Sequence, residues 1–517
     1  MTTSTATVAP TSIFDPRFRG ATLAILLVVA LSAFEGLAVA AALPQVVADV
    51  GGVSLLPWVI TSYLLTSGVA TIAAGALVDR VGVSAVFRVA VIVFTVGGVL
   101  AGFAPTMPLL VAARVLQGIG AGATNAVGLS AVGLVFPRHL VGRAFAANTT
   151  VWGVMGVAGP AIAAGLLAVA SWRWVFLVNL PLGLVALAVG WRALPGRRSD
   201  DVGSARLNPL NLALLTAFTF LSLLAVDMLD WRSIPASVGA LACGAWVLQR
   251  NRGRADALVA PRHTVMQPLG PLAWAIALLL IGAIGAQSFV PLLVSGARGA
   301  GTALTAWSVL FFVIGWTTGA NVASRLIDRY TPLTVTMWAA VLVPSALVGV
   351  GVAVGASLTL VVVFAFLFVA GSGMGATTNS GLTLLQTLVP ANELGRATAA
   401  HQYIRNQGFA VGNALVGAVL LLVVGRATGD VEMVRDVLAA GGVDGGGEGV
   451  AAGGDVAAAI QSGFATATLV GAGVAALAVV PLLALRRWLT DNDGPGVVEL
   501  DRGGPHTAEP DRGGPHA

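Results

Sequence analysis

Glu35 and Arg114 are ionisable residues inside long apolar segments, where a charge without a partner is costly. Glu35 is the one acidic residue near mid-depth of the core helices predicted below, and a buried carboxyl group can take up and release a proton. At 1.5 Å per residue, Glu35 lies about 13 Å and Arg114 about 12 Å below the outer ends of their helices. The similar depths predict a coupled, proton-carrying pair. The alternatives are a passive ion pair or an Arg114 side chain that extends to the membrane surface.

A second polar group occurs late in the chain. His401 and Arg405 are one helical turn apart, with three amides beside them, so one face of this helix is too polar for lipid. The face is predicted to line a central cavity. A gate near the cytoplasmic end is the alternative, because Arg405 lies about 13 Å from that end. Gln117, which follows Arg114 by three residues, is assigned to the same cavity or gate.

A short glycine-flanked acidic motif joins two apolar segments at residues 75–82 and recurs in part 249 residues later as Asp328-Arg329. Its glycines allow close helix approach and positive φ, and Asp79 can face the partial positive charge of a helix N-terminus. Such a contact would hold one conformation closed and act as a latch; a solvated turn is the alternative. The residues assigned to the latch are Gly75, Asp79, Arg80, Gly82, Asp328 and Arg329.

Glycines repeat between the two halves of the chain. Gly118, Gly120, Gly122 and Thr124 recur 253 residues later as Gly371, Gly373, Gly375 and Thr377. The position of Arg114 is taken by Leu367 in the second copy, so the glycines are interpreted as packing residues and Arg114 as a functional addition. Gly156 and Gly159-Pro160 predict a kinked, closely packed helix, which serves either plain packing or a moving interface.

The elements that position these residues are membrane helices, because 57% of the chain is hydrophobic, 10% is charged and mean hydropathy is +0.89. The chain has no lysine, and with a cytoplasmic N-terminus 21 arginines lie inside, 5 outside and 2 within spans. This asymmetry predicts that both termini are cytoplasmic. The fourteen predicted spans are 21–43, 55–78, 85–105, 107–135, 144–170, 174–193, 208–229, 233–250, 269–295, 302–326, 332–354, 356–379, 396–425 and 463–486.

Aligning the repeats leaves the seventh and eighth spans unmatched, so the predicted architecture is 6+2+6. The expected parts are a cytoplasmic tail (1–18), a six-helix half (19–200), an inserted hairpin (201–255), a second half (256–487) and a disordered cytoplasmic tail (488–517). Residues 426–462 are expected to form a mobile glycine-rich outer loop, with a short helix at 431–440. The single cysteine, Cys243, and the lack of metal, phosphate-loop and nucleophile motifs predict no metal, no cofactor and no enzyme activity. The net charge of +5 is attributed to membrane anchoring and not to nucleic acid.

These elements resemble the major facilitator superfamily over about residues 20–487. The motif at 75–82 is similar to the family's loop between its second and third helices, Arg114 with Gln117-Gly118 to its fourth-helix motif, and Gly159-Pro160 to its antiporter motif. Fourteen spans, with the segments 58–63, 171–181 and 393–398, resemble the EmrB/QacA-type drug:proton antiporters. Three departures are visible: Val83-Ser84 follow the loop motif instead of basic residues, Ala163-Ala164 replace paired glycines, and Glu35 stands where aspartate is frequent.

The resemblance implies an all-α polytopic protein that exports small lipophilic compounds, as in multidrug or antibiotic efflux, in exchange for protons by alternating access. Its expected partners are a lipophilic substrate, protons and membrane lipid, and its expected location is a bacterial plasma (inner) membrane. The alternatives are a narrow exporter or importer of one metabolite or lipid and, from another class, a non-transporting scaffold or receptor. Buried charges argue against a scaffold, which gains nothing from them.

Overall fold

The computed structural model describes residues 12–52, 55–196, 208–227, 233–254, 257, 259–428 and 454–492, and these residues are helices joined by short connections. Within long apolar segments, a helix satisfies every backbone polar group internally, which favours this structure in a membrane. The first half contains α1 (Arg19–Val50), α2 (Leu56–Val81), α3 (Val83–Gly102), α4 (Met107–Val135), α5 (Arg138–Val169), α6 (Arg173–Leu177) and α7 (Asn179–Ala193).

The inserted hairpin consists of α8 (Pro209–Asp227) and α9 (Ser233–Arg250). The second half begins with α10 (Pro261–Thr264) and α11 (Leu269–Leu292), which continues into the π-helical segment η2 (Leu293–Ala297). It goes on with α12 (Thr302–Leu326), α13 (Pro332–Gly355), α14 (Leu360–Leu388), the 3₁₀ segment η3 (Ala391–Glu393), α15 (Leu394–Thr428), α17 (Gly454–Ala476) and α18 (Val479–Asp491).

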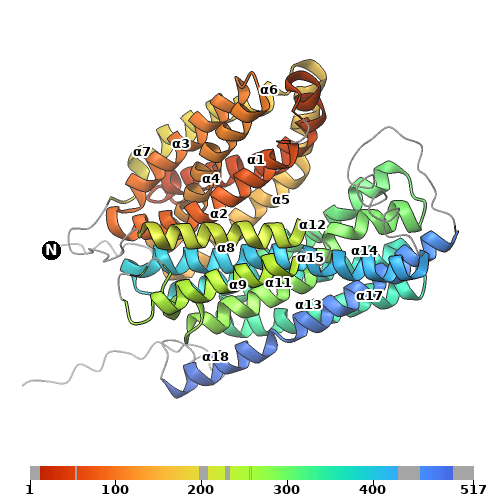
Figure 1. Ribbon diagram of the computed structural model, residues 1–517. Helices are drawn as coiled ribbons and strands as arrows, with labels where there is room; N and C mark the ends of the chain where they lie inside the picture. Colours follow the sequence, from red (N-terminus) through yellow and green to blue (C-terminus); the bar gives the residue numbers. More distant parts are fainter. Residues whose placement is uncertain are drawn as a thin grey trace, which may run out of the picture.

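A helix or a broken helix pair lies in each of the fourteen ranges predicted to cross the membrane. Within the described residues, ten helices are long and apolar enough to span it, or eleven if the bent helix α5 counts as one span. The all-helical polytopic class is therefore confirmed, while the count of fourteen spans and the cytoplasmic position of the termini stay predictions. In Figure 1 the beginning of α1 and the helix α18 lie on the same, left-hand side of the molecule.

Two predicted boundaries differ from the bounds of the helices. The outer loop expected at 426–462 is shorter, because α15 continues to Thr428 and α17 begins at Gly454. The tail expected from residue 488 begins later, because α18 continues to Asp491. The tail predicted at residues 1–18 ends where α1 begins, at Arg19, and within it Ile13 is buried and accepts a hydrogen bond from Thr22 of α1. The helix predicted at 431–440 and the glycine-rich segment around it lie outside the described residues, as does the tail beyond residue 492.

The repeated glycines perform the same packing task in both halves. A Cβ atom at Gly122 of α4 would collide with the backbone oxygen of Ser67 in α2, and one at Gly375 of α14 would collide with that of Trp316 in α12. Since Ser67 and Trp316 are themselves separated by the repeat offset of 249 residues, the two helix pairs are equivalent. Closely packed backbones of this kind replace the hydrophobic driving force that is absent within lipid.

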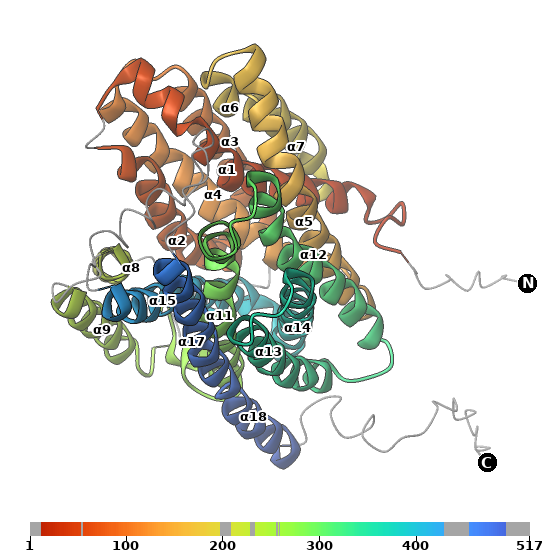
Figure 2. The same ribbon diagram turned by 90° about the vertical axis from the view of Figure 1, so that its right-hand side faces the viewer.

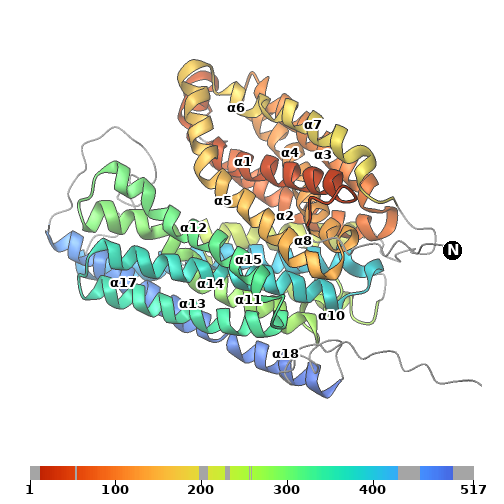
Figure 3. The same cartoon turned by 180° about the vertical axis from the view of Figure 1, so that it is seen from behind.

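The two halves approach each other at one end and diverge at the other. In Figures 1 and 3, the ribbons of the first half spread away from α12 and α17 towards the end where α6 lies. Contacts between the halves occur along α2 and α15 and along α5 and α12, and they include Gly75 against Gly395 and Gly142 against Ser324. We call the end where these contacts gather the Asp79 end, after a residue in the last turn of α2 there.

The inserted hairpin lies along the junction of the two halves, and Figure 2 shows α8 and α9 beside α15. Helix α8 contacts both α2 of the first half and α15 of the second. The Thr219 hydroxyl of α8 lies 2.6 Å from the Tyr403 hydroxyl of α15, and Gln407 of α15 donates to Ser222 Oγ at 3.1 Å. The hairpin is thus bound to the face of α15 that carries Tyr403 and Gln407.

Candidate functional site

Glu35 and Arg114 form a buried ion pair between α1 and α4. The Arg114 Nη1 atom contacts Glu35 Oε1, and the two side chains are 2% and 0% exposed. Asn179, at the start of α7, donates its amide hydrogen to the other carboxylate oxygen of Glu35 at 2.6 Å. Both carboxylate oxygens therefore have partners, which a buried charge requires if its desolvation is to be offset.

Further contacts fix the Arg114 guanidinium. Its Nη1 also donates to Gln117 Oε1 at 2.7 Å, and its Nε donates to the backbone oxygen of Val59 in α2 at 3.0 Å. The guanidinium lies over the Tyr63 ring, 4.1 Å from its centroid, which adds a cation–π interaction. Arg114 therefore has partners that do not depend on Glu35.

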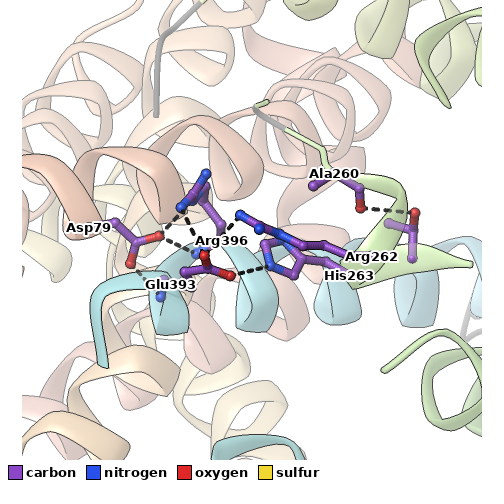
Figure 4. A network of polar contacts seen from close by, with 8 residues as sticks. Asp79, Ala260, Arg262, His263, Glu393 and Arg396 are labelled. Carbon is purple, nitrogen blue, oxygen red and sulfur yellow. Dashed lines mark hydrogen bonds and ion pairs between the residues drawn. The ribbon is translucent and has the colours of Figure 1, made fainter. Parts of the chain in front are cut away.

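Asp79 of α2 binds the beginning of α15 at the Asp79 end of the molecule (Figure 4). Its Oδ1 accepts the backbone N–H of Gly395 at 2.7 Å, and its Oδ2 accepts the backbone N–H and the Nε–H of Arg396 at 3.0 and 3.1 Å. These donors belong to the first turn of α15, so the carboxylate also faces the positive end of that helix dipole. The structure thus joins the last turn of α2 in one half to the first turn of α15 in the other, and we call this contact the Asp79 latch.

The Asp79 latch continues into a network on the second half (Figure 4). Glu393 lies 3.9 Å from Arg396, pairs with Arg262 at 2.9 Å and contacts His263 Nε2 at 3.1 Å. Burial lowers the pKa of His263 to about 4, although Glu393 favours the protonated ring. His263 is therefore neutral near pH 7 and donates its Nε2 hydrogen to Glu393. Arg262 and His263, which precede α11, therefore help to hold Glu393 beside Arg396.

The other residues assigned to the latch differ in position. Gly75 lies against the backbone of Gly395, and Gly82 ends α2 with a positive φ of 87°, the conformation expected of a glycine there. Asp328 pairs with Arg143 of α5 at 2.9 Å, but both side chains are exposed, at 39% and 44%. Arg80 and Arg329 are also exposed. The repeated motif therefore makes a buried contact in its first copy and a surface contact in its second.

The predicted packing residues contact neighbouring helices. Gly118 faces the backbone of Tyr63 in α2, and Gly120 faces that of Phe94 in α3. Gly156 lies against Val313 of α12, so this part of α5 belongs to the interface between the halves. The segments Arg138–Gly156 and Ala161–Val169 are bent by 41° relative to each other, at the stretch that contains Gly159 and Pro160. The side chain of Pro160 lies outside the described residues.

The group of Gln117, His401 and Arg405 is divided between the two halves. Gln117 is fully buried beside Arg114, so it belongs to the Glu35 site and not to the polar face on α15. His401 and Arg405 lie together on α15, where Arg405 donates to Gln402 Oε1 at 3.2 Å. Arg405 lies over the rings of Trp316 and Phe409, with centroid distances of 5.7 and 5.4 Å.

A family model described as the Major Facilitator Superfamily matches residues 25–413. The chain belongs to this superfamily. The family and the fold are those of membrane transporters, which are typically not enzymes.

Relatives within the superfamily agree with this assignment. The uncharacterized MFS-type transporter Rv1877 of Mycobacterium tuberculosis is 29% identical over 405 residues, which cover 75% of this chain and 57% of that protein. The putative multidrug resistance protein MdtD of Yersinia enterocolitica is 37% identical over 211 residues, covering 39% and 43% of the two chains. The chain spans about half the length of these relatives. Their names are those of a transporter and of a multidrug resistance protein, and the 14-helix drug:proton antiporter branch expected from the sequence stays a prediction for this chain.

Solved structures of the superfamily have the same fold. The human organic anion transporter MFSD10 covers 90% of this chain and is itself covered completely, with a TM-score of 0.63 and 13% identity. The proton:xylose symporter XylE covers 90% of this chain with a TM-score of 0.58 and 14% identity. At such low identity the likeness shows the superfamily fold alone.

Several partners of Glu35 and Asp79 were not predicted from the sequence. Asn179 and Arg396 lie in the segments 171–181 and 393–398, which resemble the family, but the sequence predicted no contact for either. The available signal was that each is a polar residue in the first turn of a helix next to an apolar core. Glu393 and His263 gave no comparable signal, because their contact joins segments 130 residues apart.

Proposed function

We propose that this protein is a proton-coupled exporter of small lipophilic compounds in a bacterial plasma membrane. The observation that carries the proposal is the fully buried Glu35 carboxylate, which has Arg114 and Asn179 as partners at the core of the first half. A structural ion pair is a poor source of stability in an apolar core, because desolvation offsets much of the attraction. A carboxyl group that gains and loses a proton explains why the pair is present.

Glu35 has the properties of a proton carrier. When it is ionised, Arg114 and Asn179 compensate its charge, and when it is protonated, Arg114 keeps Gln117 and the Val59 carbonyl as partners. Proton binding therefore weakens the contact between α1 and α4 without leaving the guanidinium unpaired. Such a change can bias the packing of helices within the first half, which is the coupling that a proton-driven exporter needs.

The arrangement of the halves supports alternating access. The Asp79 latch, together with the Asn379 amide that donates to Gly142 O at 3.0 Å, joins the halves at one end while their ribbons diverge at the other. With the Asp79 end towards the cytoplasm, as the arginine distribution predicts, this conformation is open to the outside. In this cycle an outside proton binds Glu35 as substrate leaves, and proton release to the cytoplasm allows reloading.

The experiment compares Glu35→Gln with Asp49→Asn in purified protein reconstituted into sealed vesicles. Asp49 is a matched control, because it is also an acid on α1 with an arginine partner, Arg173, but its side chain is 49% exposed. Movement of a lipophilic drug and substrate-linked proton movement are recorded under an imposed pH gradient. Glu35→Gln is expected to lose both, and Asp49→Asn to keep both. Coupled transport that persists in Glu35→Gln would remove Glu35 from the mechanism.

A further inference from the structure

Arg405 is a charged residue of the second half that takes no part in the proposed proton-coupling site. It lies eleven residues into α15, about 16 Å from the beginning of that helix. In the described part of the chain, no acidic side chain lies within 4.0 Å of it, and the Gln402 amide oxygen at 3.2 Å is its hydrogen-bond acceptor. Glu35, the acid expected at mid-depth of the described helices, is already paired with Arg114. Arg405 is half-buried and therefore carries a positive charge that has no acidic partner among the described residues.

Arg405 lies on the part of α15 between the contacts that this helix makes with α11 and with α2. Gly408 of α15 lies against Ala277 of α11, and Ala399 lies against Gly75 of α2. Viewed along the helix axis, Arg405 and Phe409 lie on one strip of α15 between these two contacts, and Tyr403 on another face binds the hairpin. Trp316 of α12 packs against this strip.

Two aromatic rings and a buried imidazole surround the guanidinium. The rings of Trp316 and Phe409 are stacked, with centroids 6.3 Å apart and planes at 17°, and Arg405 lies over both. One turn earlier, His401 is 1% exposed, and neither of its ring nitrogens has a hydrogen-bond partner. The Arg405 Nε atom is likewise without an acceptor. Buried polar atoms without partners are costly, and here they gather around one cation.

We propose that Arg405 binds the anionic group of an aromatic organic acid, with the aromatic body of that compound against Trp316 and Phe409. A guanidinium offers a planar fork of donors that matches a carboxylate or sulfonate, and its charge needs a counter-ion at this depth. His401 supplies a further donor beside the same group. The proposal rests on the transport function proposed above and narrows its lipophilic substrates to amphipathic anions. It also excludes lipophilic cations, because Arg405 repels them.

Direct binding tests this substrate class without any proton gradient. Purified protein in detergent is titrated with three compounds of equal aromatic size: 4-(1-pyrenyl)butyrate, its methyl ester and 4-(1-pyrenyl)butylamine. The wild type is expected to bind the carboxylate at least tenfold more tightly than the ester or the amine. Ester or amine binding as tight as that of the carboxylate, or no binding of the carboxylate, overturns the proposal.

Variants assign the preference to one residue. Arg405→Gln is expected to lose the tenfold preference, Arg405→Lys to keep part of it, and Arg426→Gln to keep all of it. Arg426 is a matched control, because it lies on the same helix but is exposed near its end. An unchanged preference in Arg405→Gln overturns the assignment. A protein that binds the acid but moves no protons would refute proton coupling and leave the anion site intact, so the two proposals fail separately.

Discussion

Replacement of Asp79 by asparagine is expected to shift the protein from the conformation described above towards the opposite one. The carboxylate accepts three hydrogen bonds from Gly395 and Arg396, and its side chain is 1% exposed. Asparagine keeps one acceptor oxygen but loses the charge, and it turns an NH₂ group towards N–H donors. The change therefore removes an acceptor and leaves the Arg396 guanidinium without its buried counter-ion.

The size of the shift follows from this geometry. Breaking a buried, hydrogen-bonded ion pair by removing one partner costs about 3–5 kcal/mol. That cost applies only while the Asp79 latch is closed, because separation of the halves exposes residue 79 to water. At about 1.4 kcal/mol for each factor of ten, the equilibrium between the two conformations moves by roughly 10²- to 4 × 10³-fold.

Spin labels measure the two ends of the molecule independently. With Cys243 replaced by serine, one pair of cysteines at Val81 and Arg487 reports on the Asp79 end, and a pair at Phe103 and Leu358 reports on the other. All four positions are exposed, and each pair joins one residue of the first half to one residue of the second. In Asp79→Asn, electron-electron distance measurements are expected to show a population with a longer label-to-label distance for the first pair and one with a shorter distance for the second pair.

Asp328→Asn is the matched control, because Asp328 occupies the repeat position of Asp79 but pairs with Arg143 at the surface. Exposed ion pairs contribute about 0–1 kcal/mol, so this variant is expected to shift the populations by less than about fivefold. Distance distributions of Asp79→Asn that match the wild type, or equal shifts in both variants, would refute the idea that the buried contact holds the halves together.

Two further predictions concern stability, measured as the melting temperature of the purified protein. Because the pKa of His263 is about 4 in the folded protein and near 6.5 when unfolded, the unfolded chain binds more protons between these values. Stability is therefore expected to fall as pH drops from about 6.5 to 4, by up to about 3 kcal/mol, and His263→Gln should flatten this profile; parallel profiles would contradict the cause given. Gly122→Ala is expected to cost about 1–3 kcal/mol by overpacking, whereas Gly165→Ala, whose added Cβ meets nothing within 4 Å, should be neutral; equal melting temperatures would show that α2 and α4 can separate freely.

Depth along a helix was the most useful property for locating the candidate site. Because each residue of a helix advances by a fixed rise, the positions of Glu35 and Arg114 already indicated that the two could meet, and the structure brings them together. The duplicated glycines similarly indicated close helix pairs, since only small residues allow backbones to touch. Both arguments use local geometry, which the sequence determines.

Contacts between distant segments could not be obtained in this way. Asp79 was expected at a helix N-terminus, but the choice of α15 depends on packing between residues 316 positions apart. The repeat also predicted equal roles for Asp79 and Asp328, whereas only the first is buried, because the two motif copies meet different helices. Gln117 was grouped with Arg405 by its polarity, and only the structure shows that its amide belongs to Arg114.

Substrate-linked proton movement by the wild-type protein tests the central claim most directly. Purified protein in sealed vesicles receives an imposed pH gradient and a panel of aromatic acids, neutral drugs and lipophilic cations, while internal pH is recorded. The account predicts that proton flux appears only when a transported compound is added, and that it disappears in Glu35→Gln. A folded protein that transports a compound with no accompanying proton flux would contradict it.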